Sequence, residues 1–176
     1  MRLPYNFSQF GQLVDVGGGH GGLLTSLLTA HSTLRGVLFD LPYVVAGAQA
    51  RLEAAGLAGR CEVLAGDFFE SVPSGGDVYI LKSILHGMDD AKAVRVLRNC
   101  REAMTNGGRL LVIQAIVPSG NAPARIKVSD ILHLVSGGGQ ERTEALYRTL
   151  FDASGFSLVK IHPASSSFSI LEGVRS

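Results

Sequence analysis

A run of glycines follows a short apolar segment near the start of the chain and is the clearest chemical signal in the sequence. Leu13–Val16 leads into Gly17–Gly22, in which His20 is the one residue other than glycine. Glycines let the backbone turn tightly and approach a ligand closely, and a helix that begins there offers unpaired N–H groups. The pattern predicts a loop for a nucleotide-like ligand. Gly17, Gly19 and Gly22 also fit the dinucleotide spacing, so the glycines alone leave the ligand open.

Carboxylates at three successive apolar runs narrow the choice of ligand. Asp15 lies within the first run, Asp40 ends the second and Asp67 ends the third. In an open parallel sheet such strand ends face one crevice. S-adenosylmethionine presents a cationic amino group, a ribose diol and an adenine amine that carboxylates can bind, whereas these acids would repel the pyrophosphate of a dinucleotide. The acids favour S-adenosylmethionine, although Asp40 alone fits a turn residue and Asp67 alone fits a loop carboxylate.

His86 lies just after the fourth apolar run, where it would face the same crevice. An imidazole with an ordinary pKa of about 6.5 can take a proton from a hydroxyl group. The main alternative is that His86 caps the helix behind it. A metal site formed with Asp89 and Asp90 is less favoured, because these aspartates are placed to cap that helix themselves. The pattern therefore predicts a general base.

Alternating apolar runs and helical periods indicate the elements that position these residues. The expected strands in the first part of the chain are Leu13–Val16, Gly36–Phe39, Glu62–Ala65, Val78–Leu81 and Arg109–Ile113, and the expected helices are Leu23–Ala30, Val44–Ala55 and Ala91–Met104. Beyond Pro118 the expected elements are helices near Val128–Val135 and from Thr143 to Ala153, then strands Ser157–Ile161 and Phe168–Leu171. This alternation predicts an α/β fold around a parallel sheet.

Composition limits the class of protein and of partner. The 176 residues are the size of one domain, and a net charge of +1 gives no electrostatic footprint for nucleic acid or an anionic membrane. Cys61 and Cys100 lack the spacing of a zinc site, and no apolar run reaches the ~18 residues of a spanning helix. We expect a reduced, cytoplasmic setting and a small-molecule partner, with no resident metal.

Five ordered motifs resemble those of small-molecule O-methyltransferases, namely the plant caffeic-acid type and their bacterial polyketide-tailoring relatives. They are Val14–Gly21, Phe39–Pro42, Gly66–Phe69, Leu81–His86 and Gln140–Thr143, and the resemblance runs from about Tyr5 to Gly173. The resemblance implies a Rossmann-like class I methyltransferase fold with a mostly parallel, seven-stranded sheet and helices on both faces. It also implies methyl transfer from S-adenosylmethionine to a hydroxyl of a small aromatic or polyketide-like acceptor, with S-adenosylhomocysteine as product.

The same resemblance assigns roles to residues. It places Asp40 on the cofactor ribose, Asp67 and Phe68 on the adenine, and His86 as the general base oriented by Glu141. Gln114 stands where plant members carry a second orienting acid. The full set expected to bind the cofactor is Asp15, Gly17, Gly19, Asp40, Leu41, Asp67, Phe68 and Lys82, and the acceptor is expected to contact Ile131, Leu132 and Ser136.

Departures from the family pattern keep other functions open. Gly87 and Met88 replace the usual Asp-Trp after the histidine, and Gln114 replaces an acid. These changes support a non-catalytic relative that binds the cofactor or serves as a scaffold. A nicotinamide-dependent oxidoreductase shares the glycine pattern but leaves Asp67 and the His86 and Glu141 pair without a role.

The chain also differs from the family in what precedes its first strand. Relatives of this type carry a helical dimerisation domain there, whereas here we expect residues 1–10 to be a residual linker and 11–176 to be the cofactor-binding domain. Hydrophobic residues make up 46% of the chain, which is high for a small domain. We therefore expect self-association, or a covering domain, at uncovered apolar surface.

Overall fold

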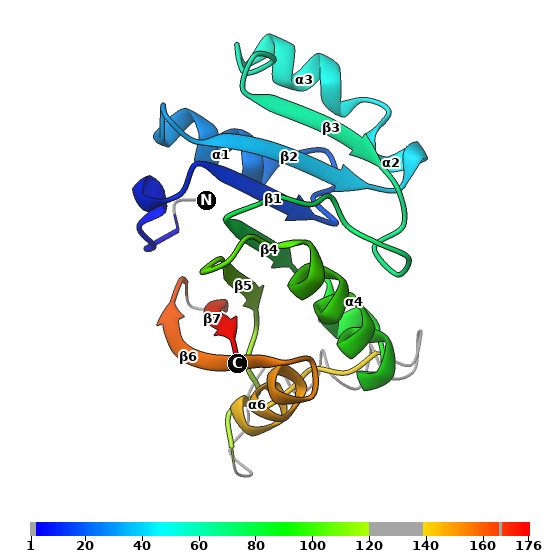
Figure 1. Ribbon diagram of the computed structural model, residues 1–176, viewed down its shortest axis with the longest axis vertical. Helices are drawn as coiled ribbons and strands as arrows, with labels where there is room; N and C mark the ends of the chain where they lie inside the picture. The colour runs from blue at the N-terminus through cyan, green and yellow to red at the C-terminus, as the bar shows by residue number, and fades with distance from the viewer. Residues whose placement is uncertain (1–2, 120–138, 166) are drawn as a thin grey trace.

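The computed structural model describes residues 3–119, 139–165 and 167–176 and shows a seven-stranded sheet between helices (Figure 1). The strand order is β3-β2-β1-β4-β5-β7-β6, and β7 pairs antiparallel with both β5 and β6 while the other pairs are parallel. The strands are β1 Gln12–Val16, β2 Arg35–Asp40, β3 Cys61–Ala65, β4 Val78–Lys82, β5 Arg109–Gln114, β6 Phe156–Pro163 and β7 Ser169–Arg175. The predicted mostly parallel sheet is confirmed.

Two apolar clusters form on opposite faces of the sheet because the central strands are buried on both sides. One cluster includes side chains of α4 (Asp90–Ala103) and α6 (Glu144–Ala153), which lie together in Figure 1. The other includes side chains of α1 (Gly22–Ala30) and α3 (Ala48–Ala54). Helices therefore cover both faces, as predicted. Within the described part of the chain, no helix is long and apolar enough to cross a bilayer.

The single helix predicted over Val44–Ala55 is wrong, because the structure has two. The first, α2, spans Pro42–Val45 and the second is α3. Gly47 precedes α3 without a side-chain cap, and glycine is among the poorest helix formers. The helix is therefore interrupted at Ala46 and Gly47 and begins again at Ala48. The helix predicted near Val128–Val135 lies outside the described residues.

The segment predicted as a linker packs onto the domain. A 3₁₀ turn, η1 Phe7–Gln9, buries Phe7 completely. The Tyr5 hydroxyl donates to Glu172 Oε1 at 2.9 Å, which ties the segment to β7. Leu3 and Phe7 of this segment thus contribute to the core of the domain, and the boundary at residue 11 stays a prediction.

Candidate cofactor crevice and catalytic histidine

The carboxyl ends of the parallel strands lie at one edge of the sheet (Figure 1). Val16 at the end of β1 pairs with Phe39, and Asp40 at the end of β2 pairs with Ala65. Lys82 at the end of β4 pairs with Ile113, one residue before Gln114. Because parallel strands end together, the glycine loop, the acids and the segment that carries His86 meet at this edge.

Backbone geometry explains the glycines of the loop. Gly17 and Gly19 have φ of 68° and 61°, in the left-handed region that favours glycine. A Cβ at Gly17 would lie 2.5 Å from Ile84 Cδ1, and one at Gly18 would lie 2.8 Å from Asp15 Cγ. The Gly17 N–H donates to Phe39 O at 2.8 Å. The loop therefore depends on close backbone approach to its neighbours.

Asp40 fixes the loop to the end of β2. Its Oδ2 accepts from the Gly19 N–H at 2.8 Å and its Oδ1 accepts from the Leu41 N–H at 2.7 Å. Asp40 therefore also serves as the turn residue that the sequence suggested as an alternative. Each carboxylate oxygen can accept a second hydrogen bond, so this geometry still allows Asp40 to bind a diol.

Asp15 is a buried carboxyl beneath the glycine loop. It is 1% exposed, and its Oδ2 has no hydrogen-bond partner among the described residues. Burial raises the pKa of Asp15 to about 7; Lys82 opposes this rise and Asp40 adds to it. The Lys82 ammonium lies 5.5 Å from the centroid of the Phe168 ring. A buried carboxyl whose Oδ2 has no partner among the described residues fits a ligand that brings its own cationic group.

The loop after β3 presents Phe68 to the glycines. The strand ends at Ala65, as predicted, and Asp67 lies in the turn that follows it, where its Oδ1 accepts from the Phe69 N–H at 2.8 Å. Phe68 Cε1 would lie 3.5 Å from a Cβ at Gly17, so the ring lies against the loop. The side chain of Asn99 donates to Phe68 O at 2.8 Å. The arrangement offers an aromatic ring and a carboxylate to a purine.

His86 and Gln114 are in contact. His86 lies in a 3₁₀ turn, η2 Leu85–Gly87, that follows Ser83, a non-glycine residue with φ of 56°. The Nδ1 atom of His86 is 2.5 Å from Nε2 of Gln114, the 1% exposed last residue of β5. Glu141 is 7% exposed. A Cβ at Gly139 would collide with His86 O, so the segment that carries Glu141 packs against the histidine turn.

The structure also places the alternatives considered for His86. Asp89 is the N-cap of α4, where its Oδ1 accepts from the Lys92 N–H at 2.8 Å. Asp90 instead pairs with Arg142. His86 is therefore not the cap of this helix, and both aspartates have other partners. The predicted acceptor contacts Ile131, Leu132 and Ser136 lie outside the described residues.

Two residues near the site were missed by sequence reasoning. Asn99, which holds the Phe68 loop, lies within a helix, where asparagine is a poor choice, and this mismatch was the available signal. Arg142 was quoted only as part of a motif, yet it is completely buried. An isolated sequence gives little indication that an arginine will be buried, because its partners come from other elements.

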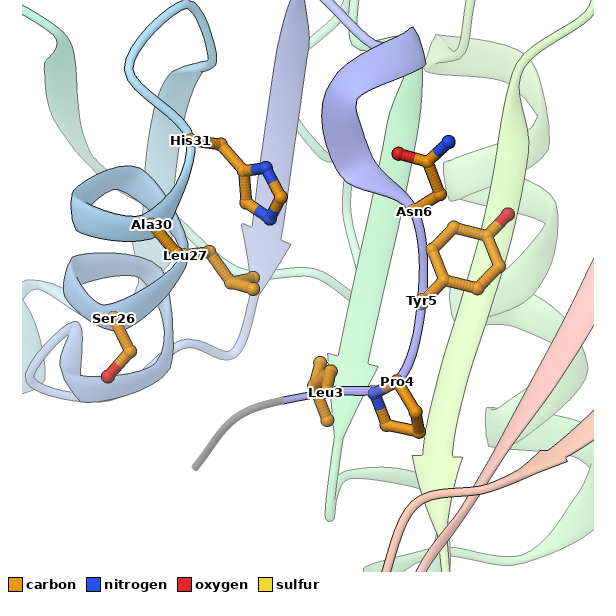
Figure 2. Close-up of a pocket in the computed structure, with 8 residues that line it drawn as sticks. All are labelled: Leu3, Pro4, Tyr5, Asn6, Ser26, Leu27, Ala30 and His31. Carbon is orange, nitrogen blue, oxygen red and sulfur yellow. The ribbon is translucent and has the colours of Figure 1, made fainter.

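A hollow of about 760 Å³ lies away from this crevice. Its lining residues are Leu3, Pro4, Tyr5, Asn6, Ser26, Leu27, Ala30 and His31, which belong to the N-terminal segment and the last turns of α1 (Figure 2). Figure 2 shows His31 and Leu27 directed toward the N-terminal segment. The glycine loop precedes the opposite end of α1, so the hollow and the crevice are separate.

Comparisons with known proteins identify the family to which the chain is similar. A profile of the O-methyltransferase domain family matches residues 3–157. Over 168 residues the chain is 45% identical to phenazine O-methyltransferase PhzM of Lysobacter antibioticus, a match that covers 96% of this chain and 49% of the relative. The chain spans about half the length of the curated relatives it matches.

Solved structures that resemble this chain are also methyltransferases. The structure of CalO1, a methyltransferase in calicheamicin biosynthesis, in its S-adenosylhomocysteine-bound form has a TM-score of 0.90 and 45% identity, over 98% of this chain and 51% of that one. The O-methyltransferase NcsB1 from neocarzinostatin biosynthesis, in complex with S-adenosylmethionine and 2-hydroxy-5-methyl naphthoic acid, also has a TM-score of 0.90, with 40% identity and coverage of 98% and 51%. These similarities confirm the predicted class I methyltransferase fold.

Proposed function

Since this chain belongs to the family of O-methyltransferase domains, we propose that it binds S-adenosylmethionine and directs its methyl group to a hydroxyl of a small aromatic acceptor. The observation that carries the proposal is the contact between His86 and Gln114 at the same sheet edge as the glycine loop. A binding crevice and a proton acceptor at one edge are what such a transfer requires. A nicotinamide-dependent oxidoreductase leaves this pair without a role.

Different residues of the crevice bind different parts of the cofactor. Asp40 binds the ribose hydroxyls, and Phe68 packs on the adenine while Asp67 accepts from its amine. Asp15 compensates the charge of the amino group, which agrees with its unpartnered Oδ2. Gly17, Gly19, Leu41 and Lys82 complete the contacts, and the glycines admit the ligand without side-chain obstruction.

His86 handles the acceptor proton. When bound, S-adenosylmethionine would supply an electrophilic methyl group on a sulfonium, whose bond to sulfur breaks to give a neutral thioether as the bond to the acceptor oxygen forms. The hydroxyl proton passes to Nε2 of His86, because Nδ1 is engaged by Gln114. For this step Gln114 presents its amide oxygen to Nδ1–H, an orientation reached by rotating the amide by 180°. Glu141 orients the histidine from the segment packed against its turn.

Positioning contributes alongside proton transfer. Alignment of the acceptor oxygen with the methyl carbon and the sulfur can supply effective molarities on the order of 10⁵ M or more. We assign this task to the acceptor residues Ile131, Leu132 and Ser136, together with the preceding half that longer relatives carry. We expect the 176 residues by themselves to bind cofactor but to methylate phenols slowly.

Self-association at apolar surface is a further part of the proposal. Among the described residues the large apolar side chains that are exposed are Tyr43, Leu146 and Val159, at 77%, 45% and 53%. They lie on α2, α6 and β6 rather than in one element. Light scattering over a concentration series tests it, and a strictly monomeric protein would contradict it.

The central test combines binding and turnover. Calorimetry of this chain with S-adenosylhomocysteine measures the crevice, with NADH as the competing ligand. Incubation with S-adenosylmethionine and 2-hydroxy-5-methyl naphthoic acid, followed by mass spectrometry, measures methyl transfer. We expect binding of S-adenosylhomocysteine that NADH does not displace, together with slow methylation. Absence of binding would refute the proposal. A protein that binds the cofactor but methylates no phenol, even when it carries the first half found in the longer relatives, would favour a scaffold role.

A further inference from the structure

Arg142 is completely buried, with a side-chain exposure of 0%. Arginine remains protonated at all ordinary pH values and is rarely buried in full, since its charge and its five N–H groups need partners. The proposed function gives this residue no task. What the guanidinium contacts therefore indicates why the chain keeps it in the interior.

The guanidinium contacts both ends of the turn that carries the histidine. Its Nη1 donates to Leu85 O at 2.7 Å and its Nη2 donates to Met88 O at 2.9 Å. These carbonyls lie one residue before and two residues after His86 in the chain. The planar fork of arginine matches two acceptors held at a fixed separation, which a lysine ammonium cannot reproduce.

Two further contacts fix the arginine itself. Nε donates to Asp90 Oδ1 at 2.9 Å, and Nη2 lies 2.8 Å from the same oxygen. Nη1 also donates to Gln140 O at 3.3 Å. Because Asp90 is the first residue of α4, the arginine joins this helix and the segment of Glu141 to the histidine turn.

The turn needs such support because it is short and weakly capped. It has three residues, and its N-cap Ile84 makes no side-chain cap hydrogen bond. One turn of helix fixes many dihedral angles for few hydrogen bonds and holds little by itself. The contact with Gln114 is made by the imidazole ring of His86, whereas Arg142 binds the backbone of the turn that carries the ring.

We propose that Arg142 is a positioning residue that holds the His86 turn, through Leu85 O and Met88 O, in the place where the imidazole meets both Gln114 and the acceptor. It acts through His86 and does not touch the reacting atoms. The inference rests on the proposed role of His86 as base. Its alternative is an arginine that stabilises the fold without effect on the histidine.

Arg60 offers a matched control for that alternative. Its Nη1 donates to His31 O at 3.1 Å and Leu34 O at 3.0 Å, and its Nη2 donates to Leu28 O at 2.8 Å. It therefore also binds backbone carbonyls with a fork, at the end of α1 remote from His86. Arg142→Lys and Arg60→Lys each remove a guanidinium group that binds backbone carbonyls, one near His86 and one away from it.

The experiment measures the tautomer of His86 directly. In the full chain, ¹⁵N-labelled at histidine, the ring nitrogen shifts report which tautomer His86 holds, and the other histidines serve as internal references. We expect Arg142→Lys to replace one His86 tautomer by a mixture and to lower kcat with 2-hydroxy-5-methyl naphthoic acid by about 10-fold or more, since small misplacement can cost up to ~10²-fold. The affinity for S-adenosylhomocysteine should change by less than about 3-fold. Arg60→Lys should lower the melting temperature but leave the His86 signals unchanged.

Unchanged His86 signals in a folded Arg142→Lys protein would overturn the inference. If that variant does not fold, Asp90→Asn keeps the arginine and removes its anionic partner, and the same signals should move in the same direction; unchanged signals there would also overturn it. The proposed role of His86 as base fails separately, if His86→Ala keeps full turnover. The tautomer measurement does not depend on turnover, so the two failures are distinguishable.

Discussion

The backbone N–H of Gly19 donates to Oδ2 of Asp40 at 2.8 Å, so the glycine loop and the carboxylate at the end of β2 form one unit. The acid that is to bind the ribose also holds the loop against which the cofactor would lie. Loss of the carboxylate therefore removes a ligand contact and loosens the loop. Both effects weaken binding, and the two can be separated by choice of variant.

Asp40→Ala should weaken S-adenosylhomocysteine binding by roughly ten- to a hundred-fold, because hydrogen bonds to a charged group contribute about 1.5–3 kcal/mol. Asp40→Asn keeps one oxygen acceptor and should lose less. Calorimetry on the folded variants measures both. Asp152→Ala removes an exposed carboxylate on α6 and serves as the control. Equal affinity for wild type and Asp40→Ala would refute the placement of the ribose.

His86→Ala should lower turnover of 2-hydroxy-5-methyl naphthoic acid by ~10²-fold or more, the usual contribution of a general base. Cofactor affinity should be nearly unchanged, since His86 is assigned to the acceptor side. His31→Ala, at the end of α1, controls for loss of an imidazole elsewhere. Should His86→Ala turn over at the wild-type rate, positioning alone would account for catalysis.

The sequence was sufficient for features whose cause is local. The glycine loop was predictable because left-handed φ at Gly17 and Gly19 requires glycine. Asp40 was predictable as a strand-end residue because apolar runs mark the strands, and parallel strands end at one edge. The contact between Gln114 and His86 followed from resemblance alone, since 28 residues separate them in the chain.

Features that depend on distant partners were not predictable. Arg142 is buried by contacts with residues 52 to 57 positions away, which no local pattern reports. The break between α2 and α3 lies within a continuous apolar period, so periodicity predicted a single helix. The insertion of β7 between β5 and β6 is likewise a matter of pairing over long range.

Gln114→Glu should change the pH dependence of turnover. A carboxylate beside Nδ1 favours the protonated imidazole, so the acid limb of the kcat/KM profile should move upward by about one pH unit or more. Above that limb the variant should match or exceed wild type, because the base is stronger. Gln9→Glu, which changes an exposed side chain in η1, controls for the added charge. A profile that does not shift would show that Gln114 does not contact His86 in solution.

Asp15 gives the protein a pH dependence in both stability and binding. Its pKa is about 7 in the folded chain because of burial, above the ordinary value of 3.8. At pH values between these two, the native state holds a proton that the unfolded state has released. The stability contributed by this proton is fully present below the lower value and is lost as pH rises through about 7. Asp15→Asn should therefore melt several degrees above wild type at pH 8, with a smaller difference at pH 5.

The affinity for the cofactor should depend on pH in the opposite direction to the stability. The ammonium of S-adenosylhomocysteine favours the ionised form of Asp15, so wild-type affinity should rise as pH increases from about 6 to 8, and the flatter profile should belong to Asp15→Asn. Calorimetry across this range, with differential scanning of the ligand-free proteins, measures both trends on the same samples. Asp152→Asn provides the comparison, since Asp152 is an exposed carboxylate on α6. Two results would contradict this assignment: lower stability of Asp15→Asn than of wild type at pH 8, and equal affinity of both proteins for S-adenosylhomocysteine. Asp15 would then be a structural carboxylate with another partner. The amino group of the cofactor would lie elsewhere.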